Sequence, residues 1–227
     1  MQRRWALLAV TIALTASACG GSSAAKGAGA RQKPLAIAGK GFTQLAPNPI
    51  GVSQITYAVV VENPNTRNAV VANLTVTFLD AAGTVVQTDA PKLAFVLAGQ
   101  QAAYGATVKG HGAVKMNVEV AVDGWTRLEP AGALTVSDVS MQPPRTGSGF
   151  RVVGKVASTY KSEMKLPLAA SVIRNDGGAI VGGSHTLIPA IPAGGSTAFE
   201  IPSLDAIPGA TAADVLITLN PPTSSEG

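Results

Sequence analysis

The chain has 227 residues, room for one large domain or two of ordinary size, and 46% of them are apolar, enough to form a core. It carries 17 basic and 13 acidic residues, but six of the basic ones precede residue 41. Residues 41–227 therefore hold 11 basic against 13 acidic side chains, a net charge of −2. This mildly acidic balance argues against a groove for nucleic acid.

Residues 1–18 have the order of a secretory signal peptide. Arg3 and Arg4 form a short cationic region, and an apolar run from Trp5 to Ala16 follows. That run is too short to span a hydrocarbon core of ~30 Å as a helix. Small residues then lead to Cys19, the single cysteine of the chain, which excludes an internal disulfide.

The segment from Ala16 to Cys19 resembles the bacterial lipobox, with Ala16 where Leu is usual. The resemblance implies cleavage between Ala18 and Cys19 and a Cys19 that is diacylated, for example with palmitate, and becomes the mature N-terminus. Several acyl chains would anchor the mature protein permanently, at the extracytoplasmic face of the cell membrane. The alternative is an ordinary secreted protein that is cut near Ala18.

Residues 19–34 are rich in Gly, Ser and Ala and include three cations, so they are predicted to form a flexible tether. Its root-mean-square span would be roughly 20 Å. The cations would favour an anionic membrane surface if they lie close to it. A merely soluble spacer is the other interpretation, and both stay open.

Past the tether, apolar and polar residues alternate with a period of two, and turn residues separate the alternating runs, which predicts strands. No window there has the pattern of an amphipathic helix. The first half is expected to hold strands at 35–39, 56–62, 70–79, 84–88, 92–97, 102–108 and 114–122. The second half is expected to hold them at 133–140, 150–158, 165–174, 179–183, 186–190, 196–201 and 213–219.

The two halves resemble each other at a period of about 95 residues. Leu97–Tyr104 matches Pro192–Phe199 at that offset, whereas Leu74–Leu79 falls on Leu168–Ile173 one residue closer, which places Arg174 where Asp80 stands. About seven strands in each unit are typical of an immunoglobulin-like sandwich. The sequence thus predicts an all-β protein with two tandem immunoglobulin-like β-sandwich domains, at 35–127 and 132–220, and a disordered tail at 221–227. We expect Trp125 to pack at the junction.

Val76–Val86, with Asn63 at the end of the preceding strand and Gly99 in a later turn, resembles the FxLYD domain of bacterial envelope proteins. Val76 and Leu79 depart from that family's aromatic residues. The stretch from Asn63 to Asn65 is also similar to the late-embryogenesis-abundant type 2 family, a related sandwich. Either resemblance implies an extracytoplasmic module of no fixed activity, so neither supplies an active site.

No motif in the sequence indicates a catalytic, cofactor or metal site. His111 and His185 fall in different halves without neighbouring ligands, and we predict loop positions for both. A cluster in the second half is predicted to form either a basic patch for an anionic polymer or headgroup, or a solvated strand edge. It consists of Arg151, Lys155, Lys161 and Lys165.

We therefore expect a non-catalytic binding or scaffolding role in the cell envelope, with the membrane as one partner through the lipid on Cys19. A further partner would be an envelope protein or a cell-wall polymer, and the oligomeric state stays open. One alternative is a carbohydrate-active or hydrolytic enzyme with a site on sandwich loops, built from Asp123, Glu129 and His185. Another is a passive structural spacer.

Overall fold

The structure is a computed structural model, and it describes residues 32–48, 50–127, 132–145, 147–203 and 205–220. Ala18, Cys19, Glu129 and the predicted tail at 221–227 lie outside these ranges. Within them the chain forms β-strands and no helix, which confirms the predicted all-β class. The described part accordingly contains no helix long and apolar enough to cross a bilayer.

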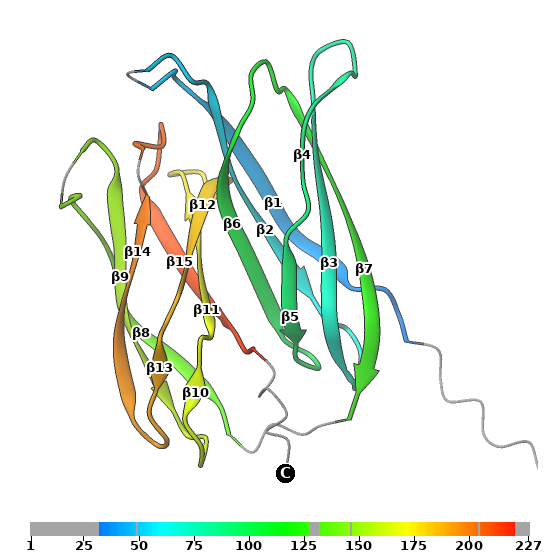
Figure 1. The fold of residues 1–227 in the computed structure, drawn as a ribbon, viewed down its shortest axis with the longest axis vertical. Helices are drawn as coiled ribbons and strands as arrows, with labels where there is room; N and C mark the ends of the chain where they lie inside the picture. Colours follow the sequence, from blue (N-terminus) through cyan, green and yellow to red (C-terminus); the bar gives the residue numbers. More distant parts are fainter. Residues whose placement is uncertain (1–31, 49, 128–131, 146, 204, 221–227) are drawn as a thin grey trace, which may run out of the picture. The chain divides into compact units, whose positions relative to one another are not determined.

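The first seven strands form two facing sheets, which we call the first sandwich (Figure 1). One sheet has the order β1-β2-β6. In the other, β3 lies between β7 on one side and β4 and β5 on the other. The strands are β1 (Ala36–Leu45), β2 (Gln54–Glu62), β3 (Asn68–Leu79), β4 (Val85–Asp89), β5 (Lys92–Val96), β6 (Gln101–Lys109) and β7 (Lys115–Thr126).

The later strands repeat this topology in a second sandwich, in sheets of order β8-β9-β14 and β12-β11-β15, with a short ladder of β10 and β13. The first two strands again share a sheet with the last strand but one, as in the first sandwich. The strands are β8 (Leu134–Gln142), β9 (Phe150–Ser158), β10 (Met164–Lys165), β11 (Leu168–Arg174), β12 (Ile180–Leu187), β13 (Ala190–Ile191), β14 (Ser196–Ser203) and β15 (Ala212–Thr218).

Most strands lie where the alternation predicted them, but two predictions were wrong. The expected strand at 165–174 is divided at Leu166, whose φ of 49° lies in the left-handed region. The expected break between 183 and 186 is absent, because β12 runs through Ser184 and His185 without interruption. Gly182 and Gly183 on this strand let another sheet approach it closely.

The turn after the third strand corrects the predicted alignment of the two halves. Asp80 opens this turn in the first sandwich, where its Oδ1 accepts a hydrogen bond of 2.8 Å from the Thr84 amide. Asn175 takes the same place in the second sandwich, and its Oδ1 accepts one of 2.9 Å from the Ala179 amide. Asn175, rather than Arg174, is therefore the counterpart of Asp80, because the side chain must cap the turn.

The four sheets stack in one order, with three apolar clusters between them. The outer clusters fill the two sandwiches, and the middle one, which includes Ala58, Val60, Ala170 and Val172, lies between the sheets of β2 and β11. Both faces of β2 and β11 are therefore buried, not one face as the alternation indicated. All described residues belong to one compact unit, so the division into two separate domains stays a prediction.

Small residues allow the two inner sheets to approach closely along this seam, the contact surface between β1, β2 and β6 on one side and β11, β12 and β15 on the other. A Cβ added to Gly41 would lie 1.9 Å from the carbonyl oxygen of Ile180. A Cβ on Gly183 would lie 2.8 Å from the Cβ of Ala58. Only glycine leaves room for backbones at these distances.

Hydrogen bonds also cross the seam. The Thr43 hydroxyl donates to the carbonyl of Val181 over 2.6 Å, and His185 Nδ1 lies 2.7 Å from the carbonyl oxygen of Gly105. Because a carbonyl can only accept, that ring nitrogen must carry the proton in this arrangement. The two sandwiches are thus joined by packing and by polar contacts.

The loops of both sandwiches gather at two opposite ends (Figure 1). We call one the near end, because the described chain begins there. It comprises residues 32–35 and the described residues of the loops after β2, β5, β7, β9 and β13. The other is the far end, which comprises the described residues of the loops after β1, β3, β6, β8, β11 and β14.

Candidate functional site

Three exposed aliphatic side chains occupy neighbouring loops at the far end of the first sandwich. Ile50 is 83% exposed, Val114 63% and Val85 56%, the largest values for bulky apolar residues in the described part of the chain. Val85 and Val114 flank Leu79: Val85 pairs with it across the ladder, and the Val114 amide donates to its carbonyl over 2.8 Å. We call these three side chains the far-end patch.

Side-chain hydrogen bonds hold the loops of the far-end patch in place. Gln44 Nε2 donates to the carbonyls of Gln54 and Gly110, at 2.8 and 3.0 Å, which ties the loop after β1 to the loop after β6. Asn48 Oδ1 accepts hydrogen bonds from the amides of Ile50 and Val52. The patch is therefore presented on braced backbone, so binding there would order few additional groups.

The loops of the far-end patch carry few charges, although the exposed Lys115 directly follows Val114. The loop after β1 has no ionisable side chain in its described part, and the loop after β6 has only His111, which is exposed. Asp80 in the loop after β3 uses its carboxylate to cap its own turn. An apolar surface of this kind suits contact with another apolar protein surface better than contact with a charged polymer.

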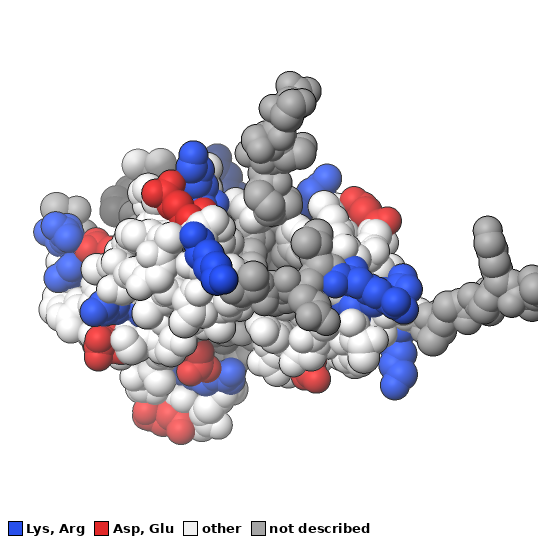
Figure 2. All heavy atoms as spheres, turned by 90° about the horizontal axis from the view of Figure 1, so that it is seen from below, with Lys and Arg blue, Asp and Glu red and all other residues white. Residues whose placement is uncertain are grey.

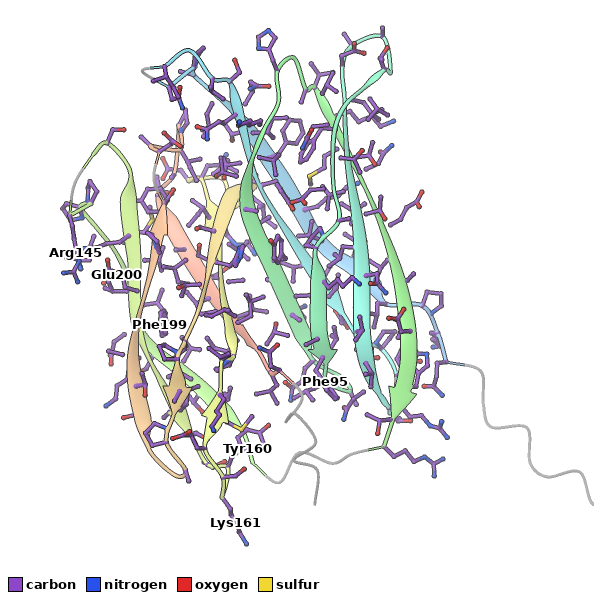
Figure 3. All side chains as sticks on the ribbon, in the orientation of Figure 1. Phe95, Arg145, Tyr160, Lys161, Phe199 and Glu200 are labelled. Carbon is purple, nitrogen blue, oxygen red and sulfur yellow. The ribbon has the colours of Figure 1, made fainter. Side chains whose placement is uncertain are left out.

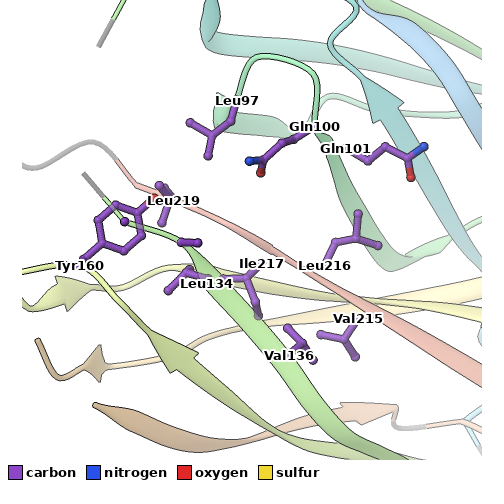
Figure 4. A pocket seen from close by; sticks show the side chains of 12 residues that line it. Leu97, Gln100, Gln101, Leu134, Val136, Tyr160, Val215, Leu216, Ile217 and Leu219 are labelled. Carbon is purple, nitrogen blue, oxygen red and sulfur yellow. The ribbon is translucent and has the colours of Figure 1, made fainter. Parts of the chain in front are cut away.

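A cavity of about 290 Å³ opens at the near end of the seam (Figure 4). Its walls come from the turn after β5, from β8 and from β15, and include Leu97, Gln100, Tyr160 and Ile217. The lining is mainly aliphatic, and burial raises the pKa of the Tyr160 hydroxyl, so this group stays neutral at physiological pH. The cavity lies at the lower limit of small-molecule pockets and brings no acid, base or nucleophile together.

A line of polar aromatic contacts runs from the first sandwich to the seam. The buried Tyr57 donates its hydroxyl proton to Asp89 Oδ2 over 2.5 Å. The ring of Tyr104 lies 6.4 Å from that of Tyr57 and 4.6 Å from that of His185. Burial, and then the neighbouring Asp89, raise the pKa of both tyrosines. Neither can serve as a phenolate near neutral pH, so we interpret the line as a structural link.

The four cations of the predicted basic patch do not lie together on one surface: Arg151, Lys155, Lys161 and Lys165. Arg151 is bound to Glu200 at 3.1 Å, and Arg145 is bound to the same carboxylate at 2.7 Å. Hydrogen bonds from Arg145 and then from Arg151 lower the pKa of Glu200. Figure 3 shows Lys161 at the opposite end of the second sandwich from Arg145 and Glu200, so the strand length separates Lys161 from Arg151.

Asp123 and His185, the two described residues of the proposed enzyme site, lie in different sheets. Asp123 is on the exposed side of β7 and accepts a hydrogen bond from Asn73, while His185 lies on β12 in the seam. The predicted loop position of His185 was wrong, whereas His111 does lie on a loop. Nowhere in the described ranges do three His, Cys, Asp or Glu side chains gather into a group that could hold a metal ion.

Trp125 is partly buried and packs against the apolar cluster of the first sandwich, close to the end of β7. The far-end patch is the feature that sequence reasoning missed. Its three residues were visible as apolar residues beside turns, but nothing in the alternation shows whether another element covers them.

No family model and no curated protein matches the chain. Among solved structures, the chain is similar to the C-terminal globular domain of an oligosaccharyltransferase from Pyrococcus abyssi, with a TM-score of 0.23 and 11% identity. The match covers 82% of this chain and 46% of that chain, so this chain spans less than half of its length. So weak a likeness carries no information about function, and the resemblance to the FxLYD domain stays a prediction.

Proposed function

We propose that this chain is a lipid-anchored extracytoplasmic protein of the cell envelope, with a non-catalytic role in which the far-end patch binds a protein partner. The proposed anchor is lipid on Cys19, which the likeness of residues 16–19 to a lipobox supports. We propose further that the two sandwiches are FxLYD-like modules, which the paired turns of Asp80 and Asn175 support.

The observation that carries the proposal is the far-end patch itself. Exposed aliphatic residues are common singly, but three at the same end of one sandwich, on braced backbone, offer an apolar surface, and exposed apolar surfaces mark interaction sites. The patch also lies at the end opposite to the point where the described chain begins. A protein anchored through its N-terminus would therefore present the patch away from its own membrane.

The decisive experiment compares two variants of the mature protein in a pull-down from envelope extracts. The far-end variant replaces Ile50, Val85 and Val114 by Ser, and the control variant replaces Leu166 and Leu187, which are 49% and 50% exposed elsewhere, by Ser. We expect a specific partner to be recovered by the native and control proteins and lost, by at least about tenfold, with the far-end variant.

Equal recovery by all three proteins would refute the far-end patch as the binding surface. If no specific protein is recovered, the binding role fails, and the passive-spacer alternative gains support. The anchor is tested separately by the intact mass of the protein from the membrane fraction. A Cys19→Ala protein that stays equally membrane-bound would contradict lipidation.

A further inference from the structure

Cations gather at the near end of both sandwiches. Lys33 lies in the entering segment, Arg67 in the loop after β2 and Arg127 directly after β7. Lys161 occupies the loop after β9 in the second sandwich. Together they form what we call the near-end cluster: Lys33, Arg67, Arg127 and Lys161.

Contacts place the three cations of the first sandwich close to one another. Lys33 and Asn65 exchange two hydrogen bonds, from the Lys33 amide to Asn65 Oδ1 at 2.7 Å and from Asn65 Nδ2 to the Lys33 carbonyl at 2.8 Å. Arg67 follows two residues later. Asn68 pairs with Thr126 across the antiparallel ladder of β3 and β7. The next residues beyond this pair are Arg67 and Arg127, which therefore lie beside each other.

The residues that line the seam cavity place Lys161 at the same end as the other three cations. Its neighbour Tyr160 lines that cavity together with Leu97 and Gln100 of the first sandwich. Gln100 in turn accepts a hydrogen bond of 3.0 Å from the Asn63 amide, which precedes the loop of Arg67. Figure 3 shows Tyr160 and Lys161 at this end of the second sandwich.

The charge of the near end differs from that of the far end. In its described loops the near end holds these four cations and one acid, Glu163, a net charge of +3. Glu62 and Lys165, on the strands just behind them, offset each other. The described far-end loops hold one cation, Arg145, and three acids, Asp80, Asp176 and Asp205, a net charge of −2, which Lys109 and Lys115 on the strands just behind the loop after β6 offset.

The near-end cations are also not neutralised by ion pairs within the described residues, where the salt bridges involve only Arg145, Arg151 and Arg174. Figure 2 looks at the near end and shows Lys and Arg side chains together with several Asp and Glu side chains. Within the cluster, Lys33, Arg127 and Lys161 are exposed and Arg67 is half-buried.

We propose that the near end is a membrane-contact surface for anionic phospholipid headgroups, an inference that rests on the proposed lipid anchor. A lipid on Cys19 would hold this end, where the chain enters the folded part, within roughly 20 Å of the bilayer. The tether also lets this end approach within a Debye length of the bilayer, ~8–10 Å, where cations are attracted by the negative surface potential of anionic lipids. The far end has no comparable excess of positive charge, so attraction at the near end orients the protein with its far-end patch away from the membrane.

The test uses the mature chain with Cys19→Ser, which removes the anchor and leaves only surface binding. Its partition is measured on vesicles of phosphatidylglycerol and phosphatidylcholine, and on vesicles of phosphatidylcholine alone, by co-sedimentation. The near-end variant carries Arg67→Glu, Arg127→Glu and Lys161→Glu. The control carries Lys109→Glu, Lys115→Glu and Lys155→Glu, three exposed lysines outside the near end with the same change in net charge.

We expect the near-end variant to lose at least about tenfold in partition onto the anionic vesicles and the control to lose less than about threefold. Binding to phosphatidylcholine alone should be weak for every protein, and added salt should weaken the anionic binding. Equal losses in both variants would overturn the proposal, because net charge alone would then explain them. Failure of the native sequence to bind anionic vesicles would also overturn it.

If the triple variant unfolds, the double variant Arg127→Glu/Lys161→Glu, which changes only fully exposed residues, replaces it with a double lysine control. The result is independent of the anchor test, because the Cys19→Ser chain carries no lipid. If the native protein carries no lipid, the proposed anchor is refuted, while vesicle binding can still be measured. If the native protein carries the lipid but the Cys19→Ser chain does not bind anionic vesicles, only the proposed membrane-contact surface is refuted.

Discussion

Alanine at position 41 tests the close approach of β1 to β12 at the seam. The added Cβ would lie 1.9 Å from the carbonyl oxygen of Ile180 and 2.6 Å from its carbonyl carbon. Both are backbone atoms of a paired strand, so they cannot turn aside and one sheet must shift by more than an ångström. Overpacking of this kind costs about 2–3 kcal/mol. The better strand propensity of alanine returns about 0.5–1 kcal/mol.

The expected net loss for Gly41→Ala is about 1–2.5 kcal/mol, measured as the free energy of unfolding in urea with circular dichroism. For a domain of this size each kcal/mol corresponds to about 2–4 °C in melting temperature. The matched control is Gly39→Ala, two residues earlier on the same face of β1. Its Cβ would meet only the Cδ1 of Ile180, at 2.9 Å, and this end of a flexible side chain can rotate away.

We expect Gly39→Ala to change the stability by less than about 0.5 kcal/mol, because strand propensity and the displaced methyl group nearly cancel. Equal stabilities of the two variants, or a Gly41→Ala protein as stable as the native one, would refute the close packing of these sheets. The comparison is sensitive to the seam alone, since both residues lie on one strand and receive the same substitution.

Two further substitutions test other parts of the fold. Tyr57→Phe should cost about 1–2 kcal/mol at neutral pH, because Asp89 loses its hydrogen-bond donor. In the folded protein the pKa of Tyr57 is raised above its unfolded value of about 10. The stabilisation of the fold by the Tyr57 hydroxyl is therefore present below pH 10 and declines as the pH rises beyond it. The native protein should therefore lose its advantage over Tyr57→Phe in alkaline urea titrations, and a constant difference above pH 10 would contradict the assigned burial. Leu166→Asn should raise stability by about 0.5–1 kcal/mol, because Asn tolerates the left-handed backbone that strains Leu166. Leu187→Asn, with similar exposure and no positive φ, should bring no gain in the same thermal melts, and equal effects would rule out strain as the cause.

The strands of both sandwiches could be predicted from the sequence because each buries one face in a sandwich core. Leu74, Val76 and Phe78 are buried on β3, with the intervening residues turned outward, as the alternation requires. The repeat was also visible, although its alignment slipped by one residue at Asp80. That position is decided by a turn hydrogen bond, which the apolar pattern does not record.

The seam could not be predicted, because the residues that form it are ambiguous in isolation. Ala58 and Val60 alternate with larger residues and so favoured a strand with one buried face. Gly182 and Gly183 were placed in a strand, but a glycine within a strand does not show by itself which backbone approaches it. Only the approach of strands more than 100 residues apart along the chain shows that both patterns serve the same contact.

The far-end patch escaped prediction for a different reason. Ile50, Val85 and Val114 are apolar residues beside turns, and such residues often fold back onto a core. Whether they are covered depends on the lengths and hydrogen bonds of three loops at once, and Gln44 makes the bridging contacts between two of them. A pattern read along one strand at a time does not contain that information.

The outward faces of the two outermost described sheets differ from the faces that meet at the seam. The outward positions of β3 carry Asn73, Thr75 and Thr77, and those of β8 include Ser137 and Ser140. None of these side chains would leave room for a backbone as the seam glycines do, and each would lose water on burial. These outward faces are comparable to the polar outer faces of the end units in a repeat array. Another sheet could stack on either face as closely as the two inner sheets do only if small apolar residues replaced these side chains.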